Sequence, residues 1–173
     1  MGKQKSHQIS NTLTTPWSAD VNHDLPHPEY PRLQMTREKW QNLNGTWKYA
    51  ITNHHAQRPA SFTREILVPF PLESALSGVG RQLQPDETLW YQRTFKIADK
   101  QHAGRTLLHF GAVDWKCAVF LNGLPIGEHI GGYDPFTFDI TDALREGSNT
   151  LEIAVQDPSD TQPIQRGKQV LDP

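Results

Sequence analysis

Two short stretches of the chain combine a carboxylate with an aromatic ring. Asp114 is followed directly by Trp115, and Tyr133 by Asp134 within a loop rich in glycine and proline. Proteins bind sugars by stacking aromatic rings on apolar C–H faces while carboxylates and amides bond to the hydroxyl groups. We therefore predict that these four residues face a carbohydrate ligand. The alternative is that Trp115, Tyr133 and Phe136 only pack the rim of the domain or against a neighbouring domain.

The chain lacks a complete signature for catalysis. A glycosidase needs two carboxylates about 5 Å or about 6.5–9.5 Å apart. The acidic residues lie mostly in turns or beside polar neighbours, and solvation explains most of them; examples are Asp86, Glu87, Asp114, Glu128, Asp134, Asp139 and Asp142. The sequence contains no phosphate-binding glycine loop, nucleophile elbow or paired-cysteine zinc motif. We expect no catalytic residue and no cofactor in this chain.

Two histidines and one cysteine are also candidates for chemistry. His54 and His55 are adjacent, so in an extended segment they point to opposite faces and cannot easily share a metal ion. Cys117 lies in the apolar run 117–121 and is expected to be a buried small hydrophobic residue rather than a nucleophile. We expect no metal site.

The elements that would position these residues are expected to be short β-strands. Segments rich in β-branched and aromatic residues recur between turn signals at 46–51, 65–69, 89–97, 105–110, 116–122, 136–140 and 150–156. Helical periodicity is almost absent, apart from short turns near Thr36 and Thr141. The sequence therefore predicts an all-β sandwich. In residues 151–155 the large apolar side chains alternate with smaller or polar ones, which predicts one buried face of a sheet.

Turns and prolines mark the boundaries of this domain. Asn122-Gly123, between two apolar runs, predicts a type I′ hairpin turn. Residues 1–35 are polar and contain four prolines, which predicts an extended N-terminal arm. We assign residues 36–156 to the sandwich and 157–173 to a loop.

Composition limits the classes of partner. The 17 basic and 19 acidic residues give a net charge of −2 without long blocks of either sign, so nucleic acid and anionic membranes are not expected partners. The sequence has no apolar run long enough to span a membrane and no apolar signal-peptide core near its start. We expect a soluble protein, and the compartment stays open between cytoplasm and export.

Six short motifs occur in order along the chain: LNGTW at 43–47, VP at 68–69, LWYQR at 89–93, FGAVDW at 110–115, VFLNG at 119–123 and EHIGGYDPF at 128–136. They cover roughly residues 36–156. In this order they resemble the N-terminal sugar-binding domain of glycoside hydrolase family 2, the family of β-galactosidases and β-glucuronidases.

The resemblance implies a specific fold and role. It implies a jelly-roll sandwich that is not catalytic itself but supports the rim of an active site. The two catalytic glutamates of this family lie in a (β/α)₈ barrel, which 173 residues do not include. The implied partners are a β-glycoside, an immunoglobulin-like domain and the barrel. It also implies that Trp90, Tyr91 and Arg93 are structural, while Asp114, Trp115, Tyr133 and Asp134 remain the candidates for facing substrate.

Two other functions remain open from the sequence. A stand-alone carbohydrate-binding module shares the sandwich fold but binds through a preformed aromatic face. An interaction domain of a receptor would have no affinity for sugar. The resemblance further implies a strand after the loop at 157–173, so we expect this chain to leave a sheet edge open and to form homo-oligomers through it.

Overall fold

The computed structural model describes residues 15–29, 39–97, 104–165 and 170. The chain divides into two units, which are treated separately: Met1–Trp47 with Glu65–Gln82, and Lys48–Arg64 with Leu83–Pro173. The turn expected from Thr36 lies outside the described residues. Over the described ranges, no helix has both the length and the apolar character needed to cross a membrane.

The first unit holds two short 3-10 helices, η1 (Pro16–Asp20) and η3 (Ala75–Ser77), and most of strand β2 (Arg64–Val68). Side chains bonded to backbone oxygens fix its local shape. Asn44 Nδ2 donates to the carbonyl oxygen of Pro26 at 3.1 Å, and Trp47 Nε1 donates to that of Leu43 at 2.8 Å. The unit therefore ties the segment before β1 to the proline-rich region through the Asn44 side chain.

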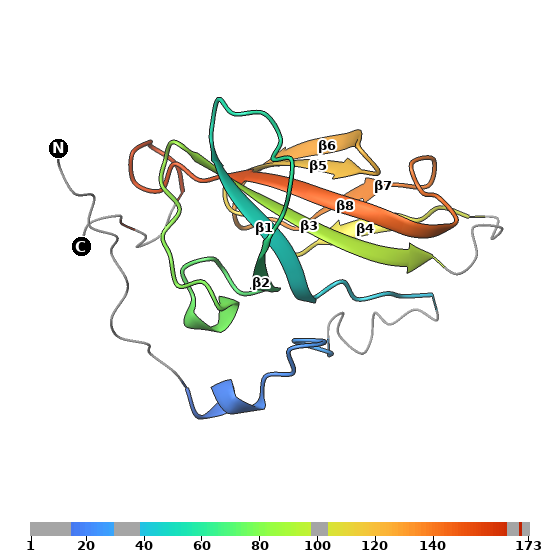
Figure 1. Ribbon diagram of the computed structural model, residues 1–173, viewed down its shortest axis with the longest axis horizontal. Helices are drawn as coiled ribbons and strands as arrows, with labels where there is room; N and C mark the ends of the chain where they lie inside the picture. Colours follow the sequence, from blue (N-terminus) through green and yellow to red (C-terminus); the bar gives the residue numbers. More distant parts are fainter. Residues whose placement is uncertain (1–14, 30–38, 98–103, 166–169, 171–173) are drawn as a thin grey trace. The chain divides into compact units, whose positions relative to one another are not determined.

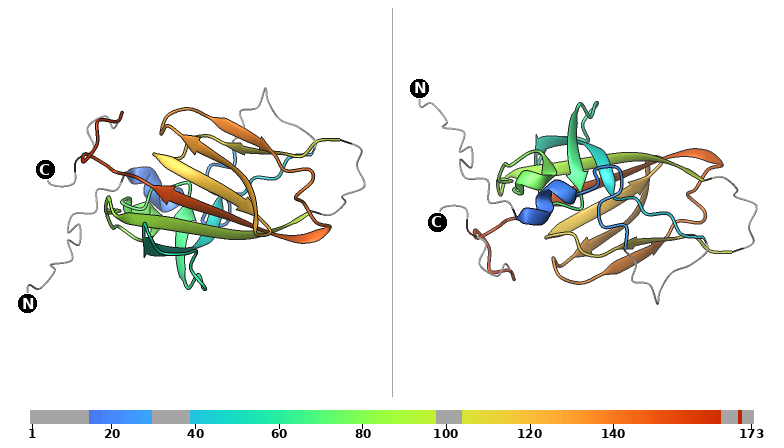
Figure 2. Two further views of the ribbon diagram at one scale, coloured as in Figure 1. Left: turned by 90° about the horizontal axis from the view of Figure 1, so that it is seen from above. Right: turned by 90° about the horizontal axis from the view of Figure 1, so that it is seen from below.

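The second unit contains the main antiparallel sheet (Figure 1). Its strands follow the order β1-β3-β8-β5-β6, and the part of β1 in this unit pairs with β3 from Lys48 onward. Strands β3 and β8 lie side by side in Figure 1 and in both views of Figure 2. The five strands are β1 (Gly45–Asn53), β3 (Glu87–Ile97), β8 (Gly147–Gln156), β5 (Lys116–Leu121) and β6 (Leu124–Ile130).

One face of this sheet forms the core because its apolar side chains line up across three strands. The register places Leu89, Val155 and Cys117 in one row. The next two rows add these residues: Tyr91, Ile153 and Val119, then Arg93, Leu151 and Leu121. Most of the apolar members are buried, and each fully buried Leu, Ile or Val contributes about 1.5–3 kcal/mol. The apolar face predicted for residues 151–155 is buried, but Glu152 on the opposite face is buried as well.

A second, two-stranded sheet packs against strand β6. It consists of β4 (Leu107–Phe110) and β7 (Phe136–Asp139). The ring of Phe136 stacks on that of His129 with centroids 4.0 Å apart. Phe138 covers Gly127 so closely that a Cβ there would be 2.4 Å from Phe138 Cε1. Within the described residues, the regular elements other than strands are the two 3-10 helices of the first unit, and the predicted all-β sandwich is confirmed.

The predicted hairpin turn is present, but the strand after it was not predicted. Asn122 and Gly123 have φ angles of 54° and 82°, both positive as a type I′ turn requires. Residues 124–130 then form β6, which the seven strand segments expected from the sequence did not include. This strand lies at the end of the sheet order, where a proline such as Pro125 is tolerated because an edge strand has unpaired N–H positions.

Candidate functional site

The first predicted pair of site residues lies in the turn before β5. Asp114 is exposed, and Trp115 is half-buried. The peptide bond between them is cis. The backbone N–H of Trp115 donates to the carbonyl oxygen of Gln156 at 3.4 Å, which attaches the turn to the end of β8.

The structure brings this pair against the second predicted stretch. The N–H of Gly131 donates to the carbonyl oxygen of Trp115 at 2.9 Å. The side chain of Asp114 lies over Gly132, where a Cβ would be 2.3 Å from Asp114 Oδ1 and 2.6 Å from its Cγ. A side chain on residue 132 would force Asp114 to move, so in this arrangement two stretches that are separate in sequence form one continuous surface.

Tyr133 and Asp134 extend that surface. Tyr133 is 59% exposed and Asp134 is also exposed. Gly131, two residues before Tyr133, has a φ of 127°, a backbone conformation that residues other than glycine rarely adopt. The surface therefore presents two carboxylates, a phenol and an indole to solvent, which are groups that bond and stack on sugars. Phe136, in contrast, stacks on His129 and Phe110, so the packing interpretation holds for it.

A small cleft adjoins Trp115 within the second unit. Its volume is about 150 Å³, and its lining residues are His54, Trp115, Lys116, Gln156, Pro158 and Gln162. Sequence reasoning considered His54 only as a metal ligand and did not single out Lys116, Gln156 or Gln162. Nothing in the local sequence links these residues, because they come from the ends of two strands, β5 and β8, and from three connecting segments.

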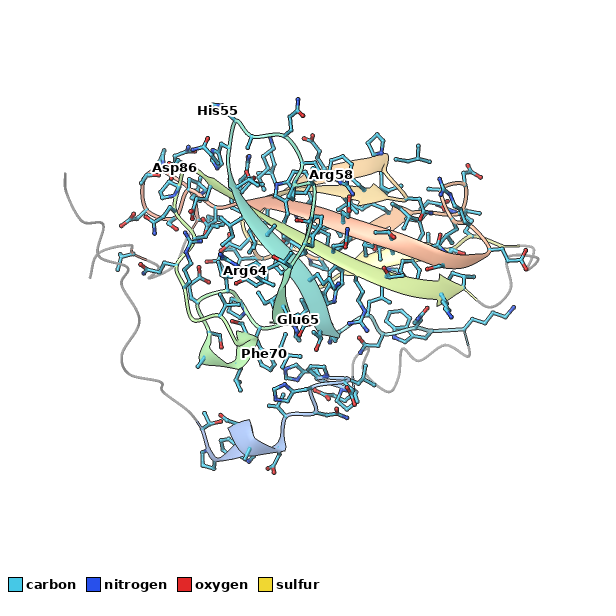
Figure 3. The ribbon with its side chains drawn as sticks, in the orientation of Figure 1. His55, Arg58, Arg64, Glu65, Phe70 and Asp86 are labelled. Carbon is cyan, nitrogen blue, oxygen red and sulfur yellow. The ribbon has the colours of Figure 1, made fainter. Side chains whose placement is uncertain are left out.

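The cleft's walls are held by backbone bonds and strand register. The N–H of His54 donates to the carbonyl oxygen of Asp86 at 2.9 Å, at the end of the unit where Figure 3 labels His55 and Asp86. Lys116 and Gln156 are directly paired across β5 and β8. Pro158 lies in a turn in which its carbonyl oxygen accepts the N–H of Thr161 at 3.0 Å.

An ion pair between the buried Glu152 and the half-exposed Arg58, on the opposite face of the main sheet, was also missed. Glu152 is 1% exposed, and both of its carboxylate oxygens accept hydrogen bonds. Oε2 accepts from Arg58 Nε at 2.6 Å, and Oε1 accepts from Gln92 Nε2 at 2.7 Å and from Arg58 Nη2. Figure 3 shows Arg58 on the loop that follows β1. Burial alone would raise the pKa of Glu152, but the bonds from Arg58 and Gln92 and the charge of Arg58 outweigh it and lower the pKa.

The remaining candidates for chemistry are accounted for by packing. Cys117 is buried, and burial raises the pKa of its thiol to about 11, so it is a thiol rather than a thiolate at neutral pH. Trp90 is buried and its Nε1 donates to Thr52 Oγ1 at 3.1 Å. Among the residues that the structure describes, no three His, Cys, Asp or Glu side chains are grouped to hold a metal ion.

Comparison with known proteins places this sandwich in a family. Residues 79–170, more than half of the chain, match the family described as glycosyl hydrolase 2 galactose-binding domain-like. The fold and the match together define a galactose-binding-domain-like β-sandwich. The chain belongs to the glycosyl hydrolase 2 galactose-binding domain-like family, as the six motifs predicted.

Individual relatives agree with this assignment. The chain is 40% identical over 67 residues to a β-galactosidase of Thermoanaerobacter pseudethanolicus, covering 39% of this chain and 9% of that protein. It is 24% identical over 146 residues to a β-glucuronidase of Paenibacillus borealis, covering 80% of this chain and 24% of that protein. A solved β-glucuronidase of Bifidobacterium dentium superposes with a TM-score of 0.52 at 29% identity, covering 66% of this chain and 19% of that one. The chain thus spans less than a quarter of the length of these relatives.

Proposed function

We propose that this chain is a non-catalytic, carbohydrate-facing domain of a family 2 β-glycosidase. Its surface around Asp114, Trp115, Tyr133 and Asp134 supports the rim of an active site carried by another part of the parent protein. The contact of Asp114 with Gly132 carries the proposal, because it joins the two carboxylate–aromatic pairs into one surface.

The chemistry of this surface suits a sugar ring at an open rim. The Trp115 indole and the Tyr133 phenol offer faces for C–H stacking, and the Asp114 and Asp134 carboxylates offer acceptors for hydroxyl groups. With Tyr133 and both carboxylates exposed, the surface does not enclose a ligand. We expect dissociation constants in the millimolar range, or about −4 kcal/mol.

The most deeply buried carboxylate of the described residues, that of Glu152, is unsuited to catalysis. A general acid in a glycosidase needs a raised pKa. The pKa of Glu152 is lowered, and both of its oxygens are bonded to Arg58 and Gln92. This supports a division in which the catalytic glutamates belong to a barrel domain of the parent.

The matched relatives guide the choice of parent. They are named β-galactosidase and β-glucuronidase, so we propose a parent that hydrolyses a β-glycoside. Within it, we keep the predicted sandwich at residues 36–156, with 1–35 as an arm, and propose an immunoglobulin-like domain and a barrel as its intramolecular partners.

Titration of the isotope-labelled chain with galactose and lactose, followed by NMR, tests this function. Chemical shifts should change around Trp115, Tyr133 and Asp134 with millimolar affinity. Tyr133→Ala should weaken the response, whereas Trp17→Ala, at a tryptophan that is 72% exposed in the first unit, should not. Shifts confined to other surfaces would contradict the proposal. Micromolar affinity centred on Trp115 would instead favour the stand-alone carbohydrate-binding module.

A further inference from the structure

We propose that the cleft lined by His54, Trp115, Lys116 and Gln156 binds an anionic sugar, one that carries a carboxylate or sulfate group at its edge. This inference rests on the proposed function for the sugar part of the ligand. The anionic part follows from the charges and hydrogen-bonding groups of the cleft itself.

Lys116 is the charged residue among those that line the cleft. Its side chain is exposed, and it forms no ion pair with any residue that the structure describes. The nearby carboxylate of Asp157 is buried, and its Oδ1 accepts the N–H of Ser159 at 2.7 Å, so it is engaged within its own turn. The ammonium of Lys116 is therefore available to a negatively charged ligand.

The other lining groups favour an acceptor-rich ligand. No carboxylate lines the cleft, so the side-chain oxygens that could accept from a neutral sugar's hydroxyl groups are those of the Gln156 and Gln162 amides. The side-chain N–H of Gln156 donates to Thr88 Oγ1 at 3.1 Å, which holds the amide in a fixed orientation. A ligand whose edge is an anion pairs with Lys116 and needs fewer acceptors from the protein.

The aromatic wall supplies the sugar specificity. Trp115 is half-buried, so its indole is held by the fold and loses little side-chain freedom when a pyranose ring packs on it. The volume of about 150 Å³ is below the size of pockets that enclose whole ligands, which suits the edge of one monosaccharide. His54 Nε2 is buried without a partner among the described residues, so the protein's own bonds leave this wall incompletely satisfied.

A matched pair of sugars tests the proposal on the 173-residue chain. Galacturonate and galactose differ only at C6, where the first carries a carboxylate. In NMR titrations both should shift Trp115 and Gln156, with galacturonate binding about two- to fivefold more tightly, the effect expected of one exposed ion pair. Galactose 6-sulfate should behave like galacturonate, and acetate alone should bind at least several-fold more weakly.

Two pairs of variants separate charge from stacking. Lys116→Gln should abolish the preference for galacturonate, while Lys96→Gln, at an exposed lysine of β3 outside the cleft, should keep it. Trp115→Ala should remove the response of the cleft to either sugar, and Trp17→Ala should not. Because Lys116 is exposed, its replacement should leave the fold intact, so the charge test does not depend on the tryptophan variant.

Each failure has a distinct meaning. Equal affinity for galactose and galacturonate, or a preference that survives Lys116→Gln, would overturn the anionic ligand while leaving carbohydrate binding in place. Acetate binding as tightly as galacturonate would overturn the sugar part. Shifts around Tyr133 but none at Gln156 would overturn the cleft alone. Absence of any sugar-induced shift in the whole chain would contradict the proposed function as well.

Discussion

The carboxylate of Asp114 lies over Gly132, at a distance that leaves no room for a side chain on the glycine. Asp114 precedes β5 and Gly132 follows β6, and these two strands are paired along the sheet. The hairpin therefore brings its two outer ends together and forms the surface that we assign to carbohydrate. The glycine at 132 is needed for space, since its φ is not in the left-handed region.

Gly132→Ala should displace the Asp114 side chain and weaken the sugar response of this surface. The added Cβ would lie 2.3 Å from Asp114 Oδ1, so we expect a loss of about 1 kcal/mol in the free energy of unfolding. Urea denaturation and the lactose titration measure the two effects. Gly104→Ala is the control, because a Cβ there meets nothing within 4 Å. Adding Asp114→Ala to Gly132→Ala should restore stability, because it removes the side chain that the new Cβ meets. If Gly132→Ala binds lactose as tightly as the wild type, the contact does not shape the surface.

Arg58→Met should destabilise the chain more than Glu152→Gln. Removing the arginine leaves a buried carboxylate without its charged partner, which costs about 3–5 kcal/mol. Removing the charge of Glu152 leaves an arginine whose side chain is 54% exposed and can be solvated, so the loss should be about 1–3 kcal/mol. Glu128→Gln, on exposed β6, is the control and should be nearly neutral. Equal losses for the two variants would show that burial of Glu152 does not decide the energetics.

The same ion pair should make stability depend on pH. The pKa of Glu152 is lower in the folded chain than its ordinary value, so its contribution is fully present above that ordinary value, about 4.3, and is lost as pH falls through the folded pKa. In Arg58→Met, Gln92 is the remaining side chain that lowers the pKa of Glu152, while burial still raises that pKa. The deficit of this variant relative to wild type should therefore shrink as pH falls from 7 to 3. Unfolding curves that stay parallel over this range would contradict the pairing.

Gly127→Ala tests how the two sheets pack. A Cβ on Gly127 would be 2.4 Å from Cε1 and 2.9 Å from Cδ1 of Phe138, a ring that packs edge-on against Phe110 and Phe136. Overpacking of this kind costs about 1–3 kcal/mol. Phe138→Leu in the same chain should recover part of the loss, and Gly104→Ala again serves as the control. A neutral Gly127→Ala would mean that the small sheet is free to shift away from β6.

Local sequence signals predicted most of the fold. Each of the seven expected strands is present, because β-branched and aromatic runs bounded by turns leave few alternatives. The eighth, β6, was missed although its turn was recognised, because Pro125, Gly127 and Glu128 are depleted in strands. Its pairing with β5 depends on the hairpin rather than on its own composition.

The site was predicted in its parts but not in its assembly. Asp114, Trp115, Tyr133 and Asp134 were identified by type, whereas the contact of Asp114 with Gly132 depends on the pairing of β5 with β6. The ion pair between Arg58 and Glu152 joins residues 94 apart in sequence and leaves no local pattern. The cleft beside Trp115 was missed for the same reason, since its residues come together only in the folded sheet.

The central claim, that this domain faces carbohydrate without cleaving it, is tested most directly by incubating the purified chain with nitrophenyl β-galactoside and β-glucuronide. We predict no release of nitrophenol above background, because the family resemblance assigns both catalytic glutamates to a barrel domain, and the most buried carboxylate of the described residues, Glu152, has a lowered pKa. Turnover that persists through repurification and disappears in Asp114→Asn or Asp134→Asn would contradict the account, because it would make the predicted rim a catalytic site.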